Sequence, residues 1–140
     1  MDKQIIFEDD HIRVIFLKGS SDSLVVSFGD LISRAKGMSI NAEKSLIKYQ
    51  YNVIGIMPKQ KTWFPKSSML NMQQQIQPFL AQFKERVGYG GSMGGYAAIK
   101  YSNFSVHDKF HRTLILSGFC FLKIAKISLN SSFFPKPIKR

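Results

Sequence analysis

The sequence predicts an α/β fold with a mostly parallel, doubly wound sheet and helices on both faces. Short apolar segments alternate with helix-forming segments, which is typical of a parallel sheet with helical crossovers. Leu24 to Phe28 and Tyr51 to Met57 are continuously apolar, as strands covered on both faces are. A glycine-rich segment, Val87 to Ala98, then joins a strand candidate to a helix candidate. The length of 140 residues fits one domain with a substantial core.

Six apolar segments are strand candidates, and the first four of them are bounded by turn residues. The first two lie close enough in the sequence to form an antiparallel pair. In chain order the candidates are Gln4 to Phe7, His11 to Leu17, Leu24 to Phe28, Tyr51 to Met57, Arg86 to Gly90 and Arg112 to Ser117.

Helices are expected between the later strands. A short helix over 42–48 could be capped by the side chain of Asn41. Apolar residues at three- and four-residue spacing predict an amphipathic helix of about four turns over 69–83. Pro78 lies inside this segment, and it should kink the helix or begin a second one. A third helix is expected over 94–101, after the glycine-rich segment.

The segment Gly90-Gly91-Ser92-Met93-Gly94 reads G-x-S-x-G. This pattern places a serine nucleophile on a sharp strand-to-helix turn, where small flanking residues let strand and helix approach closely. The alternatives are a glycine-rich turn that merely contains a serine, or a phosphate-binding loop. The nucleotide-binding alternative lacks both the lysine and the spacing of the G-x-x-x-x-G-K-[ST] motif.

On this motif and the order of elements, residues 4–118 resemble the α/β-hydrolase superfamily, in particular its bacterial esterase-like members. The resemblance implies a serine hydrolase that acts on carboxylic esters or related acyl substrates, with Ser92 as the nucleophile. It also implies oxyanion-binding N–H groups from Met93 and from Asp30 or Gly29. The histidine often found in the family's loop after the third strand is absent here, where the sequence reads Phe28-Gly29-Asp30.

The base and acid that activate such a serine cannot be identified in the sequence. In the resembled family they follow later strands, in the order Ser, Asp or Glu, His, yet only one strand candidate follows Ser92. His107 and His111 are expected at the opposite end of the sheet. His11 is expected on the serine's side but three strands away, roughly 14 Å at about 4.8 Å per strand.

We therefore expect a hydrolase-type chain that is truncated after the sixth strand. Residues 1–118 would form the hydrolase-like domain, and residues 119–140 a basic, poorly ordered or non-native tail. Activity would then be impaired. The alternative is a catalytically silent binding module or gene remnant whose basic tail contacts an anionic partner.

The segment Lys59 to Lys66 follows the fourth strand, so it should lie at the same end of the sheet as Ser92. Trp63 and Phe64 could line a substrate pocket there, with the lysines favouring an anionic substrate. The alternative is that these aromatic residues only anchor a long loop to the body of the domain.

The net charge of +11 is concentrated toward the end, since residues 101–140 hold 7 of the 20 Lys and Arg but only one acidic residue. The dispersed lysines favour a solvated basic surface over specific nucleic-acid binding. No secretory signal or membrane span is apparent, and the single cysteine, Cys120, fits a reducing cytoplasm. We expect no cofactor and no metal site, a small acyl-ester substrate, and self-association through an exposed sheet edge.

Overall fold

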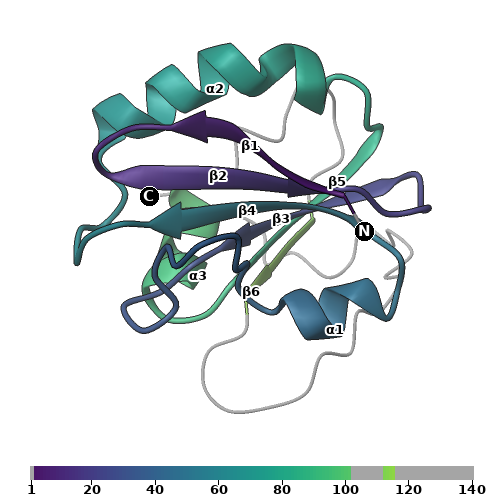
Figure 1. Ribbon diagram of the computed structural model, residues 1–140, viewed down its shortest axis with the longest axis horizontal. Helices are drawn as coiled ribbons and strands as arrows, with labels where there is room; N and C mark the ends of the chain where they lie inside the picture. The colour runs from purple at the N-terminus through teal and green to yellow at the C-terminus, as the bar shows by residue number, and fades with distance from the viewer. Residues whose placement is uncertain (1, 102–111, 116–140) are drawn as a thin grey trace, which may run out of the picture.

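In the part of the chain that the structure describes, a twisted six-stranded sheet forms the centre and three helices cover its two faces (Figure 1). The computed structural model describes residues 2–101 and 112–115. The strands are β1 (Lys3–Glu8), β2 (Ile12–Leu17), β3 (Ser23–Phe28), β4 (Asn52–Pro58), β5 (Glu85–Gly90) and β6 (Arg112–Ile115). The helices are α1 (Glu43–Ile47), α2 (Lys66–Leu80) and α3 (Met93–Lys100).

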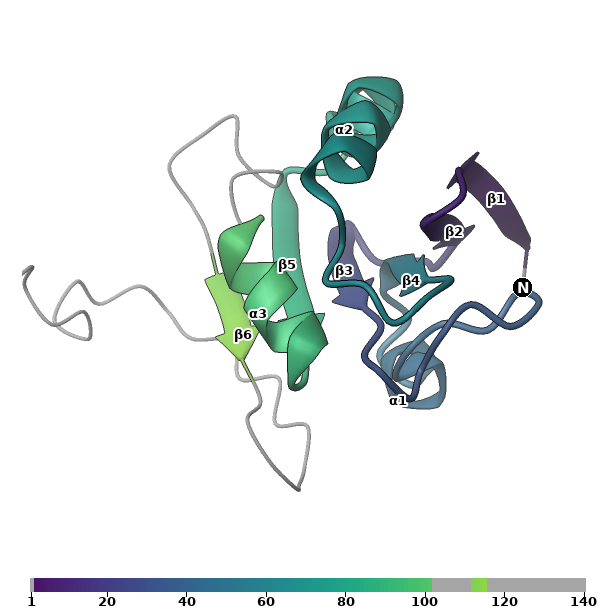
Figure 2. The same ribbon diagram turned by 90° about the vertical axis from the view of Figure 1, so that its left-hand side faces the viewer.

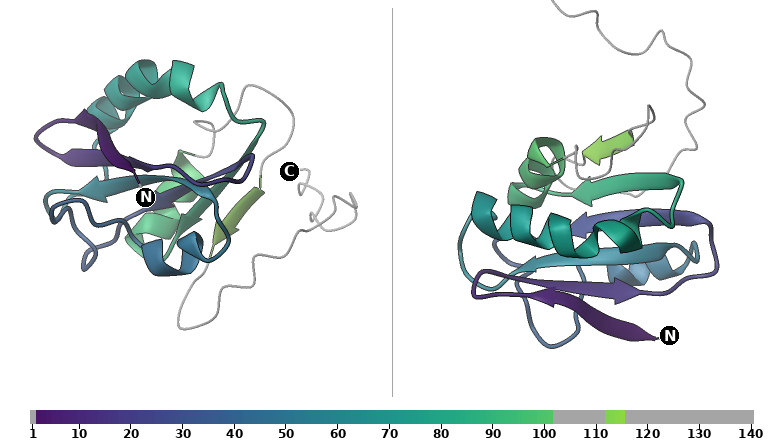
Figure 3. Two further views of the ribbon diagram at one scale, coloured as in Figure 1. Left: turned by 45° about the vertical axis from the view of Figure 1, so that its right-hand side comes forward. Right: turned by 90° about the horizontal axis from the view of Figure 1, so that it is seen from above.

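The sheet is mixed, and the prediction of a mostly parallel, doubly wound sheet of the α/β-hydrolase type is wrong. The strand order is β1-β2-β4-β3-β5-β6, and the strands follow one another in this order in Figure 3. β2 runs antiparallel to both β1 and β4, whereas the pairs β3–β4, β3–β5 and β5–β6 are parallel. The cause lies in the links at 9–11 and 18–22. They are shorter than the dozen or so residues that a parallel crossover needs, so the chain direction reverses at each link.

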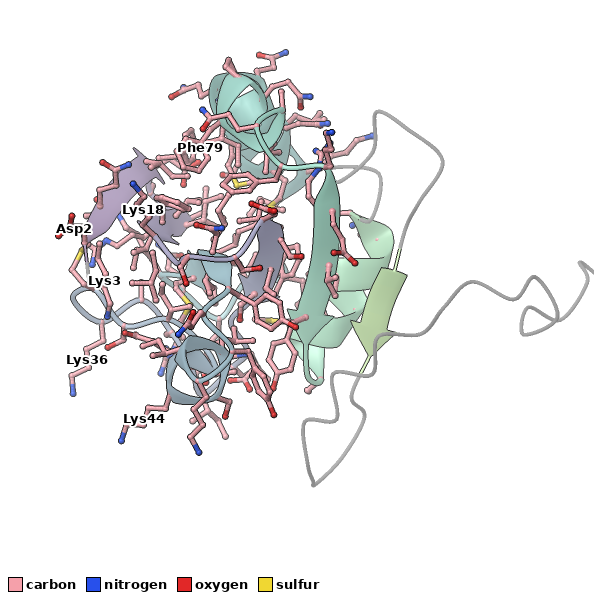
Figure 4. All side chains as sticks on the ribbon, turned by 90° about the vertical axis from the view of Figure 1, so that its right-hand side faces the viewer. Asp2, Lys3, Lys18, Lys36, Lys44 and Phe79 are labelled. Carbon is pink, nitrogen blue, oxygen red and sulfur yellow. The ribbon has the colours of Figure 1, made fainter. Side chains whose placement is uncertain are left out.

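α2 and α3 lie on one face of the sheet and α1 on the other (Figures 2 and 3). On the first face, alternate residues of β2, β3 and β4 pack against the apolar sides of α2 and α3. Phe79 of α2, labelled in Figure 4, packs edge-on against Phe16 of β2, with ring centroids 4.4 Å apart. The fully buried residues of this layer include Ile12, Leu24, Ile54, Ile56, Phe64, Met69, Met72 and Met93.

The second face is covered by α1 and the loop before it. Leu46 of α1 and Ile40 of the loop pack on the remaining side chains of the strands, including Val25 and Val53. The side chain of Asn41 does not cap α1 as predicted, because the N-cap residue is Ala42, which makes no side-chain cap. Asn41 instead donates from Nδ2 to the carbonyl oxygen of Phe28, at 2.8 Å.

α2 is one continuous helix, although Pro78 lies within it. It begins at Lys66, directly after Pro65, three residues earlier than the apolar spacing predicted, and it ends at Leu80. Pro78 falls in the last turn, where the missing N–H and the steric clash affect only the end of the helix. This position explains why Pro78 does not divide the segment into two helices.

Candidate functional site

The turn between β5 and α3 holds Ser92 in an uncommon backbone conformation. β5 ends at Gly90 and α3 begins at Met93, and Ser92 between them has φ of +52°. Non-glycine residues rarely adopt this left-handed region, and holding one there costs about 1–3 kcal/mol. The Ser92 side chain is exposed, and among the described residues no group hydrogen-bonds to its hydroxyl.

Two glycines of the G-x-S-x-G motif allow backbone segments to touch at this turn. A Cβ on Gly90 would lie 2.3 Å from the carbonyl carbon of Gly94. A Cβ on Gly94 would lie 2.7 Å from the carbonyl oxygens of both Phe28 and Gly29. Because Cβ atoms do not approach other atoms so closely, the first turn of α3 can rest on β5 and on the end of β3 only with glycine at both positions.

Two backbone N–H groups, one in this turn and one in the segment that adjoins it, have no acceptor among the described residues. One belongs to Met93, the first residue of α3, whose side chain is fully buried in the core. The other belongs to Asp30, two residues after β3. Their segments adjoin, since Gly94 lies against the Phe28 and Gly29 carbonyls. Free N–H groups at the start of a helix, together with the helix dipole, favour a developing negative charge.

Hydrogen bonds hold the Asp30 segment in place. The Asp30 carboxylate accepts from the backbone N–H groups of Ile32 and Ser33, at 2.8 and 2.6 Å. The N–H of Gly29 donates to the carbonyl of Ile56 at 2.9 Å, which continues the pairing with β4. These bonds fix the backbone on both sides of Asp30. Burial, and secondarily the Asp30 carboxylate, raise the pKa of the nearby Tyr89 phenol.

His11 lies at the same end of the sheet as Ser92 but too far away to serve as its base. The N–H of Lys59, directly after β4, donates to the His11 carbonyl at 2.8 Å, which places His11 at the carboxyl end of β4. β4 and β3 stand between β2 and β5. Three strand spacings of about 4.8 Å give a separation of roughly 14 Å from the turn that holds Ser92. His107 and His111 lie outside the described residues.

Trp63 and Phe64, both predicted to line a pocket, have different environments. Phe64 is buried, with φ of +55°, and packs edge-on against Phe28 with ring centroids 5.6 Å apart. Its carbonyl accepts a hydrogen bond of 2.8 Å from the hydroxyl of Tyr101. Trp63 is 55% exposed and lies edge-on to Tyr96 of α3, with centroids 5.6 Å apart. Phe64 thus anchors the loop, whereas Trp63 lies at the surface.

Sequence reasoning did not single out Tyr96 and Lys100. Both lie on α3, at four-residue spacing after Ser92, and such spacing places residues on one face of a helix. That signal was present in the sequence. The sequence does not indicate the contact of Tyr96 with Trp63, because this contact depends on how the loop before α2 folds back. Asn41 was noticed as a cap, but its role in bracing the end of β3 depends on a contact between distant segments.

Two further expectations concern a metal site and a membrane-spanning helix, neither of which the sequence predicted. In residues 2–101 and 112–115, no three His, Cys, Asp or Glu side chains come together as a metal site would require. Within the same residues, no helix is both long and apolar enough to cross a membrane. Cys120 and the segment 119–140 lie outside the part that the structure describes.

Comparison with known proteins identifies a similar fold in a capsule O-acetyltransferase. No protein-family model matches the sequence, and no curated protein sequence does either. The capsule O-acetyltransferase of Neisseria meningitidis serogroup A has a similar structure, with a TM-score of 0.52 at 14% identity. A mutant of that protein in complex with CoA gives 0.53 at 15% identity, over 78% of this chain and 48% of that one. The chain therefore spans about half the length of these neighbours.

These comparisons contradict the predicted membership of the α/β-hydrolase superfamily. The similar structures are O-acetyltransferases, and no match supports a bacterial esterase. The comparisons likewise contradict the predicted serine hydrolase activity on carboxylic esters. At this level of identity the similarity shows the fold, so the residues of the turn at Ser92 have to be argued from their own geometry.

Proposed function

We propose that the protein is an acyltransferase in which the Ser92 hydroxyl takes up an acyl group and passes it to a hydroxyl-bearing acceptor. The observation that carries this proposal is the turn between β5 and α3. It exposes Ser92 in a left-handed conformation directly before Met93, and it adjoins the segment of Asp30. The N–H groups of Met93 and Asp30 have no acceptor among the described residues. A strained, exposed hydroxyl in a turn that carries free N–H donors suits attack on a carbonyl, because such donors can bind the oxyanion that forms.

The type of donor is inferred from the structure of the capsule O-acetyltransferase mutant, which is in complex with CoA. In the first step, Oγ of Ser92 would attack the thioester carbonyl, the C–S bond would break, and the CoA thiol would leave with the serine's proton. In the second, the acceptor hydroxyl would attack the acyl-serine. The new ester would form as the bond to Oγ breaks, and Ser92 would regain a proton.

Proton transfer sets a further requirement on the site. A serine hydroxyl becomes an effective nucleophile only when a base within about 3 Å takes its proton. Among the described residues the only histidine is His11, roughly 14 Å away by strand spacing. The described residues thus supply the proposed nucleophile and oxyanion donors, and none of their histidines lies within reach to act as the base.

The test is direct detection of the acyl-serine. The full chain is incubated with acetyl-CoA, quenched in acid and digested, and mass spectrometry locates any added acetyl group. We expect acetylation of Ser92 and none in the Ser92→Ala variant. Ser67→Ala, which removes an exposed serine at the start of α2, is the matched control and should leave the acetylation intact. Circular dichroism verifies that each variant is folded. A folded chain that acquires no acetyl group at Ser92 would overturn the proposal.

A further inference from the structure

An exposed aromatic pair with an adjacent lysine lies on α3 and the loop before α2. Trp63 and Tyr96 are 55% and 49% exposed and meet edge-to-face, with ring centroids 5.6 Å apart and planes at 85°. Nζ of Lys100 lies 5.7 Å from the centroid of the Tyr96 ring and 5.3 Å from that of Tyr101. Single exposed apolar side chains are common on proteins, whereas contiguous exposed apolar surface marks binding sites more often.

This patch begins one helical turn from Ser92. The N–H of Tyr96 donates to the Ser92 carbonyl at 3.1 Å, and Lys100 lies one turn further along α3. At 1.5 Å rise per residue, the patch extends from about 6 to about 12 Å from Ser92 along the helix axis. A molecule whose reacting group lies at Ser92 and which extends along α3 would therefore reach the patch.

The loop side of the patch is held rigidly. Phe64, the neighbour of Trp63, is buried against Phe28, and the Tyr101 hydroxyl hydrogen-bonds to its carbonyl. Trp63 therefore projects from an anchored backbone. A surface whose side chains are positioned in advance loses less conformational entropy when a ligand binds.

The charge of the described residues around the patch is positive. Lys61 and Lys66 flank Trp63 in the sequence, and both are exposed. Within the part of the chain that the structure describes, no carboxylate pairs with them or with Lys100, whereas Lys59 pairs with Glu8 at 2.6 Å. Unpaired lysines beside exposed rings suit a ligand that is both cyclic and anionic.

We propose that Trp63, Tyr96 and Lys100 form a subsite for a phosphate-bearing ring. The rings would pack on the ligand's cyclic part, and Lys100 would bind the phosphate. The place of this subsite in catalysis rests on the acyl transfer proposed for Ser92. Such a ligand has two sources in that reaction: the nucleotide part of the CoA donor, or a phosphorylated sugar as acceptor.

Trp63 provides a specific readout because it is the only tryptophan of the chain. The full-length protein is titrated with adenosine 3′,5′-bisphosphate and with glucose 6-phosphate, while tryptophan fluorescence is recorded. Adenosine and glucose are the uncharged controls. We expect saturable quenching by at least one phosphorylated ligand, and we expect salt to weaken its binding. The uncharged counterpart of that ligand should bind at least tenfold more weakly. Which ligand binds identifies the donor or the acceptor as its source.

A pair of lysine variants tests the position of the charge. Lys100→Gln should weaken binding of the phosphorylated ligand about tenfold. Lys44→Gln removes the same charge from α1, on the other face of the sheet, where Lys44 projects into solvent (Figure 4). It should leave the affinity unchanged. No quenching by either phosphorylated ligand, equal binding of charged and uncharged forms, or equal effects of the two variants would each overturn the proposal.

The proposed subsite and the proposed acyl transfer can be contradicted independently of each other. Ser92→Ala should retain the fluorescence response, because the subsite does not include the hydroxyl. A response without acetylation of Ser92 would retain the subsite and overturn the proposed function. Acetylation that proceeds equally well in Lys100→Gln, with no fluorescence response, would retain the function and overturn the subsite.

Discussion

At the scale of single residues, the left-handed backbone of Ser92 carries a cost that glycine would avoid. With φ of +52°, a side chain costs roughly 1–2 kcal/mol relative to glycine, while glycine loses up to about 1 kcal/mol more backbone entropy on folding. We expect Ser92→Gly to be up to about 1 kcal/mol more stable than Ser92→Ala, and both to lack acetylation. Urea unfolding followed by circular dichroism measures the difference. A glycine variant less stable than the alanine variant would show that the turn is not strained.

Gly94 is the residue where a single methyl group should do most harm. Its Cβ would lie 2.7 Å from two carbonyl oxygens at the end of β3, and a backbone shift to relieve this would displace the start of α3. We expect Gly94→Ala to lower the free energy of unfolding by about 1–3 kcal/mol. Gly37→Ala is the matched control, since a Cβ there would meet nothing within 4 Å and would add only the strain of φ +55°. An equal or larger loss in the Gly37 variant would contradict this account.

The sequence was most informative where local geometry restricts the residue type. Glycines at positions 90 and 94 indicated a close strand-to-helix turn, and the structure shows the backbone contacts that require them. It was least informative about the direction in which a side chain points. Trp63 and Phe64 are adjacent aromatic residues, and nothing local indicates that Phe64 takes a left-handed conformation and turns inward. That outcome is set by Phe28 and Tyr101, which are distant in sequence.

At the scale of elements, Asn41 ties the loop before α1 to the end of β3. Its amide donates to the Phe28 carbonyl, and Oγ of Ser27 donates to the Asn41 carbonyl, both at 2.8 Å. Asn41→Ala leaves the Phe28 carbonyl without this donor and should cost about 1 kcal/mol of stability. Because Phe28 lies two residues before Asp30, we also expect slower acetylation of Ser92 at unchanged ligand affinity.

The comparison variant for this prediction is Ser45→Ala on α1, whose hydroxyl makes no hydrogen bond with another described residue. It should acetylate at the parental rate. If Asn41→Ala lowers stability but acetylates as fast as Ser45→Ala, then Asn41 supports the fold without positioning the site.

The predicted elements agreed with the structure where they depend on local patterns, and they differed where partners are distant. Short apolar segments marked all six strands to within a few residues, because a strand's composition reflects its burial. The antiparallel pairing of β2 with β4 joins segments about 40 residues apart. Apolar alternation does not encode which strand is the neighbour. The antiparallel pair of β1 and β2 was therefore predicted from their short link and is confirmed, whereas the antiparallel pairing of β2 with β4 was missed.

At the scale of the whole molecule, one carboxylate links three strands at the end of the sheet that carries the site. Glu8 of β1 accepts hydrogen bonds from Arg13 of β2 at 2.8 and 3.0 Å, and it pairs with Lys59, directly after β4. The hydrogen bonds from Arg13 and then Lys59 hold the pKa of Glu8 below its usual value, despite an opposing effect of burial. A second carboxylate, Asp9, follows it in the turn to β2.

Burial alone would raise the pKa of Asp9, but hydrogen bonds outweigh this effect. They come from Ser68 and from the backbone N–H groups of Ile12 and His11, and the pKa is lowered. A carboxyl with a depressed pKa in the folded state contributes stability above its unfolded pKa. That contribution is lost as the pH falls through the folded value. Glu8 and Asp9 therefore change the stability in the same direction as the pH falls. Acid should weaken the link between β1, β2 and β4.

We expect the free energy of unfolding to fall as the pH decreases below about 4.3, the usual pKa of Glu, and to continue falling into the range of the lowered values. Urea unfolding at a series of pH values between 7 and 3 measures this slope. Glu8→Gln and Asp9→Asn each remove one titrating group while keeping its size, so each should flatten the slope. Glu85→Gln is the matched control, because Glu85 lies at the start of β5 and has no ion pair among the described residues. A slope that Glu85→Gln reduces as much as Glu8→Gln would show that acid acts on net charge alone, and not through the contacts of Glu8.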